Sequence, residues 1–261
     1  MLNELQKRLL EELIIRYNYT DAYHLIVNED PDEKQAVTRL LKSCKHALNF
    51  SFDDAYHAII DLGESNKDSK KIGDMKKDLM LLVEGNPDAI FSELVENIRL
   101  QLHAERYIDF IGRVYRLKEA ILKYIFIKNH IDKNRFSFRS EIVSKKAILK
   151  ILRKKYRIYN PNLSYGITTY IGKNLKKNTK YIEVLDILNS QKLDEIMELR
   201  HDSIIGHGFR GVGKNHVAAI FGNPYHIIDD FTDCLEMIDI NIQKNKYDKL
   251  NKYMLDLLNH L

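Results

Sequence analysis

An arginine and a histidine seven positions apart are the residues best suited to chemistry in this chain. Arg200 and His207 are separated by a stretch that includes His201, Asp202 and Ser203. Arginine stays protonated and grips phosphate oxygens with two hydrogen bonds, and an imidazole exchanges a proton near neutral pH. Such a pair can stabilise the charge and assist the proton transfer when a ribose 2'-hydroxyl attacks the neighbouring phosphorus. It therefore predicts RNA cleavage without a metal, although an isolated Arg and His more commonly form a surface ion pair and a helix-end histidine.

Two geometries would bring this pair together. In an unbroken helix, positions seven apart project from one face about 10 Å apart along the axis. Gly206 and Gly208, which flank His207, argue instead that the helix ends there. A close backbone approach or a left-handed residue would then turn the histidine back toward Arg200.

The elements that must position these residues are predicted to be helices. The chain has 261 residues, of which 44% are hydrophobic and 30% charged, with only 11 glycines and 4 prolines. This is an ordinary globular composition that favours an all-α fold over one that needs frequent turns.

No apolar run approaches the roughly 20 residues that cross a bilayer, and no signal peptide precedes the first helix, so we expect a cytoplasmic protein. Cys44 and Cys234 are far apart and predict buried thiols, with no metal site and no cofactor.

Positive charge is concentrated in the segment from Lys133 to Lys180. It carries 14 basic residues and one acid, Glu141, although the formal net charge of the whole chain is only +4. Such a segment is typical either of a surface that meets a polyanion or of a solvated helical face. On the first interpretation, the candidate RNA-binding residues in this segment are Arg153, Lys154 and Lys155.

Along the chain, periodicity predicts a first part, residues 1–86, and a second part, residues 87–261. Residues 19–26 resemble residues 52–59 after a shift of 33, which indicates helical hairpins. Asn86-Pro87-Asp88 resembles a helix start, followed by helical periodicity to residue 129 with a break at residues 103–107. In its second half, Arg113 and Arg116 either brace the active centre or form a surface ion-pair ladder with Glu119. The run at residues 163–172 suggests a short β-hairpin insertion.

A rival motif follows His207. Gly208 to Lys214 matches the spacing of a phosphate-binding P-loop, but Asn215 stands where that loop has a Ser or Thr. A P-loop must also follow a buried strand, whereas this stretch follows a predicted helix. We therefore expect a glycine-rich turn in which Arg210 and Lys214 line the phosphate-binding end of the helix.

Three blocks together resemble a known family. Glu198-Leu199-Arg200 followed by Ser203-Ile204-Ile205-Gly206-His207-Gly208-Phe209 is similar to the signature of HEPN ribonucleases, in the form found in CRISPR type III-associated ancillary RNases. The stretch from Arg113 to Glu119 resembles the upstream helix of that family, and Ile15 to Ala22 resembles its helical linker. The resemblance covers most of the chain, in family order. It implies a helical linker followed by a HEPN helical bundle.

The resemblance also implies an activity. A HEPN ribonuclease of this kind cleaves single-stranded RNA without a metal, in type III CRISPR antiviral defence. Arg200 and His207 of two protomers would form a composite active site across a homodimer, supported by His201, Asp202 and Ser203. Family members usually begin with a Rossmann-like CARF domain that binds cyclic oligoadenylate, whereas here Met1 leads directly into the helical linker. That departure makes control by cyclic oligoadenylate doubtful.

Two other functions are open on the sequence alone. One is a non-catalytic HEPN module that binds RNA or protein through its basic face, and the other is a toxin-like or scaffolding HEPN protein whose dimer surface is the function. Salt-sensitive binding without any product would select the first. Growth arrest that depends on Arg200 would argue for a toxin.

Overall fold

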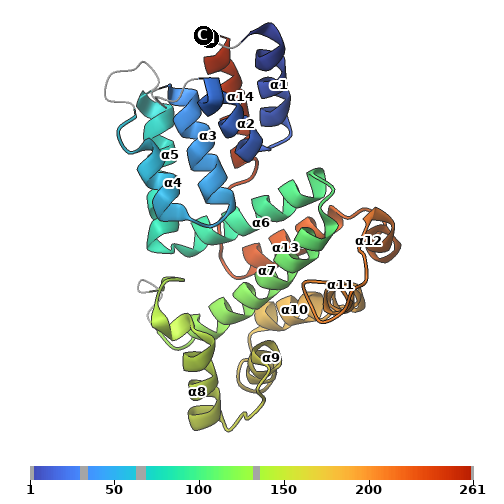
Figure 1. Cartoon of the computed structure of the whole chain (residues 1–261). Coiled ribbons are helices and arrows are strands. Elements are labelled where there is room, and N and C mark those ends of the chain that lie inside the picture. The colour runs from blue at the N-terminus through green and yellow to red at the C-terminus, as the bar shows by residue number, and fades with distance from the viewer. Residues whose placement is uncertain (1–2, 30–34, 63–68, 132–135, 260–261) are drawn as a thin grey trace. The chain divides into compact units, whose positions relative to one another are not determined.

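The computed structural model describes residues 3–29, 35–62, 69–131 and 136–259. Helices account for all the regular secondary structure within these ranges, which confirms the predicted all-α class (Figure 1). Two compact units are present: residues 1–84 with 244–261, and residues 85–243. The sequence placed residues 244–261 with the second part of the chain, whereas the structure groups them with the first.

The first unit is a series of helices in which each packs against the next, closed by the last helix of the chain. Its helices are α1 (Glu4–Ile15), α2 (Tyr19–Glu29), α3 (Ala36–Leu48), α4 (Phe52–Ile59), α5 (Ser69–Glu84) and α14 (Lys246–Leu258). Helix α14 packs against α1 and α3. The repeat falls at the starts of α2 and α4, where Tyr19 and Phe52, the first residue of each copy, are both buried.

The second unit carries the candidate site and has a single large apolar core. Its helices are α6 (Pro87–His103), α7 (Tyr107–Lys128), the short 3-10 helix η2 (Glu141–Val143), α8 (Lys145–Tyr156), α9 (Leu163–Asn174), α10 (Thr179–Leu188), α11 (Gln191–Asp202), α12 (Lys214–Phe221) and α13 (His226–Met237). Helix α7 packs against α6, α9 and α11. This central helix therefore connects the basic half of the unit to the half that holds Arg200.

The start of α6 follows the expected capping chemistry. Pro87 occupies the first turn of α6, and the Asn86 side chain accepts a hydrogen bond from the Ala89 amide, so the predicted start is confirmed. The predicted break is present as well, because α6 ends at His103 and α7 begins at Tyr107. Glu105, between them, has a positive φ of 54°, which turns the chain from one helix into the next.

The β-hairpin predicted for residues 163–172 is wrong, because these residues form most of α9. The Asn162 side chain accepts from the Tyr165 amide and caps the helix. Leu163, Ile167 and Tyr170 then recur at helical spacing on the buried face. Burial of this face in the core outweighs the strand propensity of a short β-branched run, because strand propensity depends strongly on context.

An aromatic cluster fixes α8 and α9 to the end of α7. The His130 Nδ1 lies 2.6 Å from the Phe126 carbonyl oxygen, and its Nε2 lies 2.8 Å from the Tyr156 hydroxyl. The Tyr170 ring packs against Phe126, His130 and Tyr156. Burial lowers the pKa of His130, although its hydrogen bond to the Phe126 carbonyl acts in the opposite direction. The end of α8 is therefore packed against the core through Tyr156.

Cys44 and Cys234 are both buried, as predicted. Burial raises the pKa of Cys234 to about 12. A thiol with so high a pKa is almost entirely protonated at neutral pH and is a poor nucleophile. None of the helices in the described ranges is both long enough and apolar enough to cross a membrane.

Candidate functional site

Arg200 lies in the last turn of α11 and is oriented by a tyrosine of α7. Leu193, Ile196 and Leu199 are buried and fix α11 on the core. The Cζ of Arg200 lies 4.7 Å from the ring centroid of Tyr115, the distance of a cation–π contact. Its Nε is buried and has no hydrogen-bond partner within the described part of the chain. The guanidinium is thus held in place while one of its donors is unused.

The chain folds back on itself directly after α11. The helix ends at Asp202, and the buried Ser203 hydroxyl donates to the Arg200 carbonyl oxygen at 2.8 Å. The Gly206 amide donates to the Ser203 carbonyl, and the His207 amide donates to the His201 carbonyl, each at 2.8 Å. These bonds satisfy carbonyl groups that a helix end leaves without partners. We call residues 203–208 the return loop.

The return loop brings two imidazoles together. The ring centroids of His201 and His207 are 5.1 Å apart, and the rings meet edge to face at 79°. Both side chains are exposed. Of the two geometries that the sequence left open, the structure has the one in which the helix ends before His207. The ring contact of His207 is with His201, which had been assigned only a supporting role.

Gly206 and Gly208 are required by close backbone approach and not by a left-handed conformation. A Cβ added at Gly206 would overlap the carbonyl oxygens of Arg200 and His201. One added at Gly208 would overlap the carbonyl of Asp202. Neither glycine has a positive φ. The loop can therefore lie this close to the end of α11 only because residues 206 and 208 are glycines, which have no Cβ.

Apolar residues of the return loop and its flank divide between the core and the surface. Ile205 packs onto α7, where a Cβ at Gly112 would lie only 2.8 Å from its Cδ1. Ile204 is 67% exposed, and Phe209, the residue after the loop, is 93% exposed. The loop is thus anchored on one side and presents two large apolar side chains to solvent on the other.

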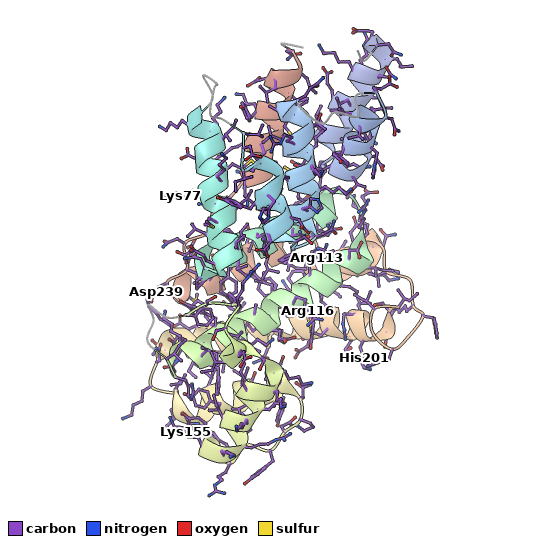
Figure 2. All side chains as sticks on the ribbon, turned by 60° about the vertical axis from the view of Figure 1, so that its left-hand side comes forward. Lys77, Arg113, Arg116, Lys155, His201 and Asp239 are labelled. Carbon is purple, nitrogen blue, oxygen red and sulfur yellow. The ribbon has the colours of Figure 1, made fainter. Side chains whose placement is uncertain are left out.

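The two arginines of α7, which Figure 2 labels, have different contacts. Arg116 lies 5.8 Å from the same Tyr115 ring that Arg200 covers, and it pairs with Glu119 at 3.4 Å. Its neighbour Arg113 donates from Nε to the side-chain oxygen of the buried Asn97 of α6. Burial lowers the pKa of Arg113. Arg116 therefore belongs both to the surroundings of Arg200 and to a surface ion pair, whereas Arg113 connects α7 to α6.

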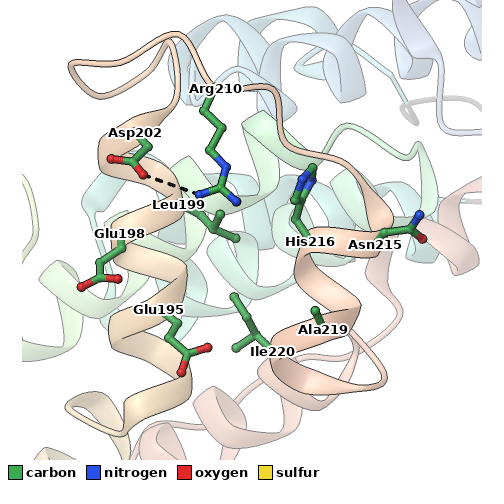
Figure 3. Close-up of a pocket in the computed structure, with 9 residues that line it drawn as sticks. All are labelled: Glu195, Glu198, Leu199, Asp202, Arg210, Asn215, His216, Ala219 and Ile220. Atoms are coloured by element: carbon green, nitrogen blue, oxygen red, sulfur yellow. Dashed lines mark ion pairs between the residues drawn. The ribbon is translucent and has the colours of Figure 1, made fainter.

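Asp202 and Arg210 face a pocket of about 350 Å³ between α11 and α12 (Figure 3). The Arg210 Nη1 lies 3.7 Å from the Asp202 Oδ2, and the pocket is lined by Glu195, Glu198, Leu199, Asp202, Arg210, Asn215, His216, Ala219 and Ile220. Its three carboxylates outnumber its one arginine, a charge balance that is unfavourable for phosphate. Lys214, the first residue of α12, is exposed and does not line this pocket.

The glycine-rich stretch after His207 forms the connection between α11 and α12. Gly213 is the residue before α12, and its amide donates to the His216 Nδ1 at 3.0 Å. The element that precedes this stretch is a helix, in the place where a P-loop has a strand.

The basic residues predicted to bind RNA lie on a different helix from Arg200. Arg153, Lys154 and Lys155 are exposed on α8, and Lys155 extends over the ring of Tyr156 at 5.4 Å. Lys133 and Arg135, at the start of the basic segment, lie outside the described residues. The structure thus separates the predicted site residues into three groups: Arg200, His201 and His207, which we call the Arg200 centre; the acidic pocket between α11 and α12; and the basic helix α8.

Sequence reasoning missed Tyr115 as a site residue. Tyr115 lies between the two arginines that had been singled out, yet no pattern in the sequence pairs it with a residue 85 positions later. The available signal was the position of an aromatic ring inside a charged block, since arginine side chains commonly stack on such rings.

No family model, curated protein or solved structure matches this chain. Within the described ranges, no group of three His, Cys, Asp or Glu side chains is placed to hold a metal ion.

Proposed function

We propose that this protein is a metal-independent endoribonuclease that cleaves single-stranded RNA by attack of a 2'-hydroxyl on the adjacent phosphorus. The observation that carries the proposal is the group of Arg200, His201 and His207. The Arg200 guanidinium is held on the Tyr115 ring, and the next residue, His201, contacts His207 through its exposed imidazole. These are the groups that the reaction needs.

The chemistry follows from these groups. One imidazole takes the proton of the 2'-hydroxyl as its oxygen bonds to phosphorus, and the other gives a proton to the departing 5'-oxygen as the bond between phosphorus and that oxygen breaks. The products are a 2',3'-cyclic phosphate and a 5'-hydroxyl. Arg200 stabilises the additional negative charge on the phosphorane by two charge-assisted hydrogen bonds.

The resemblance to HEPN ribonucleases supports the same function and extends it. On that basis we propose a homodimer in which the sites of two protomers face each other, acting in the cytoplasm in type III CRISPR defence. The exposed Ile204 and Phe209 support dimerisation, because large apolar side chains beside a site commonly mark a surface that a partner covers.

The proposal is tested with a fluorescent single-stranded RNA in buffer that contains EDTA. We compare the wild type with Arg200→Ala, His201→Ala and His207→Ala, using His226→Ala, an exposed histidine of α13, as the control. Wild type and control should leave 2',3'-cyclic phosphate ends. Each site variant should be slower by about 10²- to 10⁴-fold, the usual contribution of a group that transfers a proton or stabilises charge.

Three results would contradict the proposal. Wild-type rates in both histidine variants would exclude proton transfer by the pair. Loss of all cleavage in EDTA would show a metal-dependent enzyme. Binding of RNA with no product from any form would favour a non-catalytic RNA-binding module.

A further inference from the structure

Helix α8 carries a stripe of positive charge along one face. The side chains that line a surface groove of about 710 Å³ beside it are Lys145, Lys146, Leu149, Lys150, Arg153 and Lys154. They form three adjacent pairs, each four residues after the last, which is the spacing of a single helical face, and extend over roughly 14 Å of helix axis. We call the five cations among them the α8 stripe.

Nothing in the described part of the protein neutralises the α8 stripe. All five cations are exposed, and none pairs with a carboxylate of a described residue. The sequence from Ile142 to Ile182 contains no Asp or Glu. Lys145 and Lys146 occupy the first turn of α8, which has no acidic residue, although the helix dipole favours negative charge there. An anionic partner would relieve both the mutual repulsion and the unfavourable dipole interaction.

A nucleic-acid strand fits this surface better than a membrane does. The apolar side chains Ile148 and Leu152 of α8 are completely buried, and Leu149 and Ile151 are partly buried against the same core, so the helix has no large apolar face to insert into lipid. Tyr159 and Tyr165, which follow α8, are 64% and 62% exposed. Proteins that bind single strands commonly combine a basic groove, whose cations contact phosphates, with exposed aromatic rings on which bases stack.

We propose that the α8 stripe is a second RNA-binding site, which holds the phosphate backbone of single-stranded RNA apart from the Arg200 centre. The choice of RNA rests on the proposed function, whereas the binding of a single-stranded polyanion rests on α8 alone. Because the stripe contacts phosphates outside the reacting centre, it contributes to binding substrate and not to the chemical step. Its removal should raise KM and leave kcat unchanged.

The test compares two variants with the same change of charge. The stripe variant is Lys145→Gln, Lys150→Gln, Arg153→Gln and Lys154→Gln; the control variant is Lys70→Gln, Lys77→Gln, Lys249→Gln and Lys252→Gln, all exposed positions of the first unit. The probe is a fluorescent 20-nucleotide 2'-O-methyl RNA, which has the phosphates but lacks the attacking hydroxyl. Its affinity is measured by anisotropy from 50 to 200 mM NaCl, and circular dichroism reports folding.

The stripe variant should bind the probe at least about tenfold more weakly at 100 mM NaCl. The slope of log affinity against log salt should become shallower by roughly 2 to 3, since each contact with a single-strand phosphate contributes about 0.7. The control variant should stay within about threefold of wild type. A variant with Lys145→Arg, Lys150→Arg and Lys154→Arg keeps the charge and should bind like wild type, which separates lost contacts from misfolding.

Equal affinities of the stripe and control variants would overturn the inference. So would binding of polyglutamate or of anionic vesicles as tightly as the RNA probe, which would assign the surface to an acidic protein or to a membrane. The result is independent of catalysis because the probe cannot be cut. If the wild type cleaves no RNA but the stripe variant still binds the probe more weakly than the wild type does, the proposed function fails and the binding site stands.

Discussion

At the scale of single residues, the Arg200 centre depends on a neighbour that has no role in proton transfer. Tyr115 offers the face of its ring to Arg200 at 4.7 Å and lies 5.8 Å from Arg116. A planar guanidinium stacked on a ring keeps its edge free for two parallel hydrogen bonds to phosphate. Tyr115 is therefore a positioning residue whose ring, and not its hydroxyl, matters.

Replacement of Tyr115 tests this role. We expect Tyr115→Phe to cleave RNA within about twofold of wild type, whereas Tyr115→Leu should lose roughly tenfold in kcat/KM, the equivalent of a cation–π contact of about 1 to 2 kcal/mol. Steady-state cleavage of one RNA by the three proteins measures the effect. Similar losses in the Phe and Leu variants would show that the ring does not orient Arg200.

The residues of the candidate site were more predictable from the sequence than their contacts were. Arg200, His201 and His207 lie within eight consecutive positions, so a short motif was enough to make them candidates. Tyr115 and Gly112 belong to a helix far back in the chain, and their pairing with Arg200 and Ile205 depends on how α7 packs against α11. Local sequence does not encode such a contact.

At the scale of elements, the return loop controls where His207 lies. Its amide hydrogen bonds to the end of α11 exist only because the backbone approaches the last carbonyl groups of the helix so closely. The two glycines thus have a geometric function in placing the two imidazoles together. A side chain at either position would displace the loop from the end of α11.

This can be checked by alanine substitution. Gly206→Ala and Gly208→Ala should each reduce kcat by about 100-fold, because a displacement of about 1 Å in a catalytic group has a cost of that order. Gly211→Ala is the matched control, since a Cβ there meets nothing within 4 Å and the position has no positive φ. Cleavage assays are combined with thermal unfolding. Retention of full activity in Gly208→Ala would show that the close approach is not needed.

Residues 163–172 were predicted as a β-hairpin but form most of α9. They show why helix and strand are harder to tell apart in a β-branched run. The run Ile167-Thr168-Thr169-Tyr170-Ile171 has the composition of a strand. In the structure the Thr169 hydroxyl donates to the Tyr165 carbonyl one turn earlier, and the flanking apolar residues face the core of the second unit. The all-α class was predictable from composition because it averages over the whole chain, whereas this element depended on a partner surface that the sequence did not reveal.

At the scale of the whole molecule, the last helix belongs with the beginning of the chain. Asn251 of α14 is buried, accepts a hydrogen bond from the Tyr19 hydroxyl at 2.7 Å and donates to the Ile14 carbonyl at 2.7 Å. Tyr247 and Met254 of the same helix are fully buried. This pairing was not predictable from the sequence, because helical periodicity in α14 indicates an apolar face but not what covers it.

Asn251→Ala should destabilise the first unit by about 2 to 4 kcal/mol, because it leaves the Tyr19 hydroxyl and the Ile14 carbonyl buried without their partner. Urea unfolding followed by circular dichroism measures the loss. Lys252→Ala, an exposed neighbour in α14, serves as the control and should change the free energy of unfolding by less than about 0.5 kcal/mol. Identical unfolding midpoints for the two variants would contradict the importance of this contact.

The place of α14 also sets an order of events on the ribosome. Residues 85–243 form a continuous unit, so all of its helices have been synthesised before α14 exists. The other helices of the first unit emerge earliest. The unit nevertheless lacks α14, which packs against α1 and α3, until translation reaches residue 258. Domains generally fold as units during synthesis. Residues 85–243 can therefore complete their fold before the first unit has acquired α14.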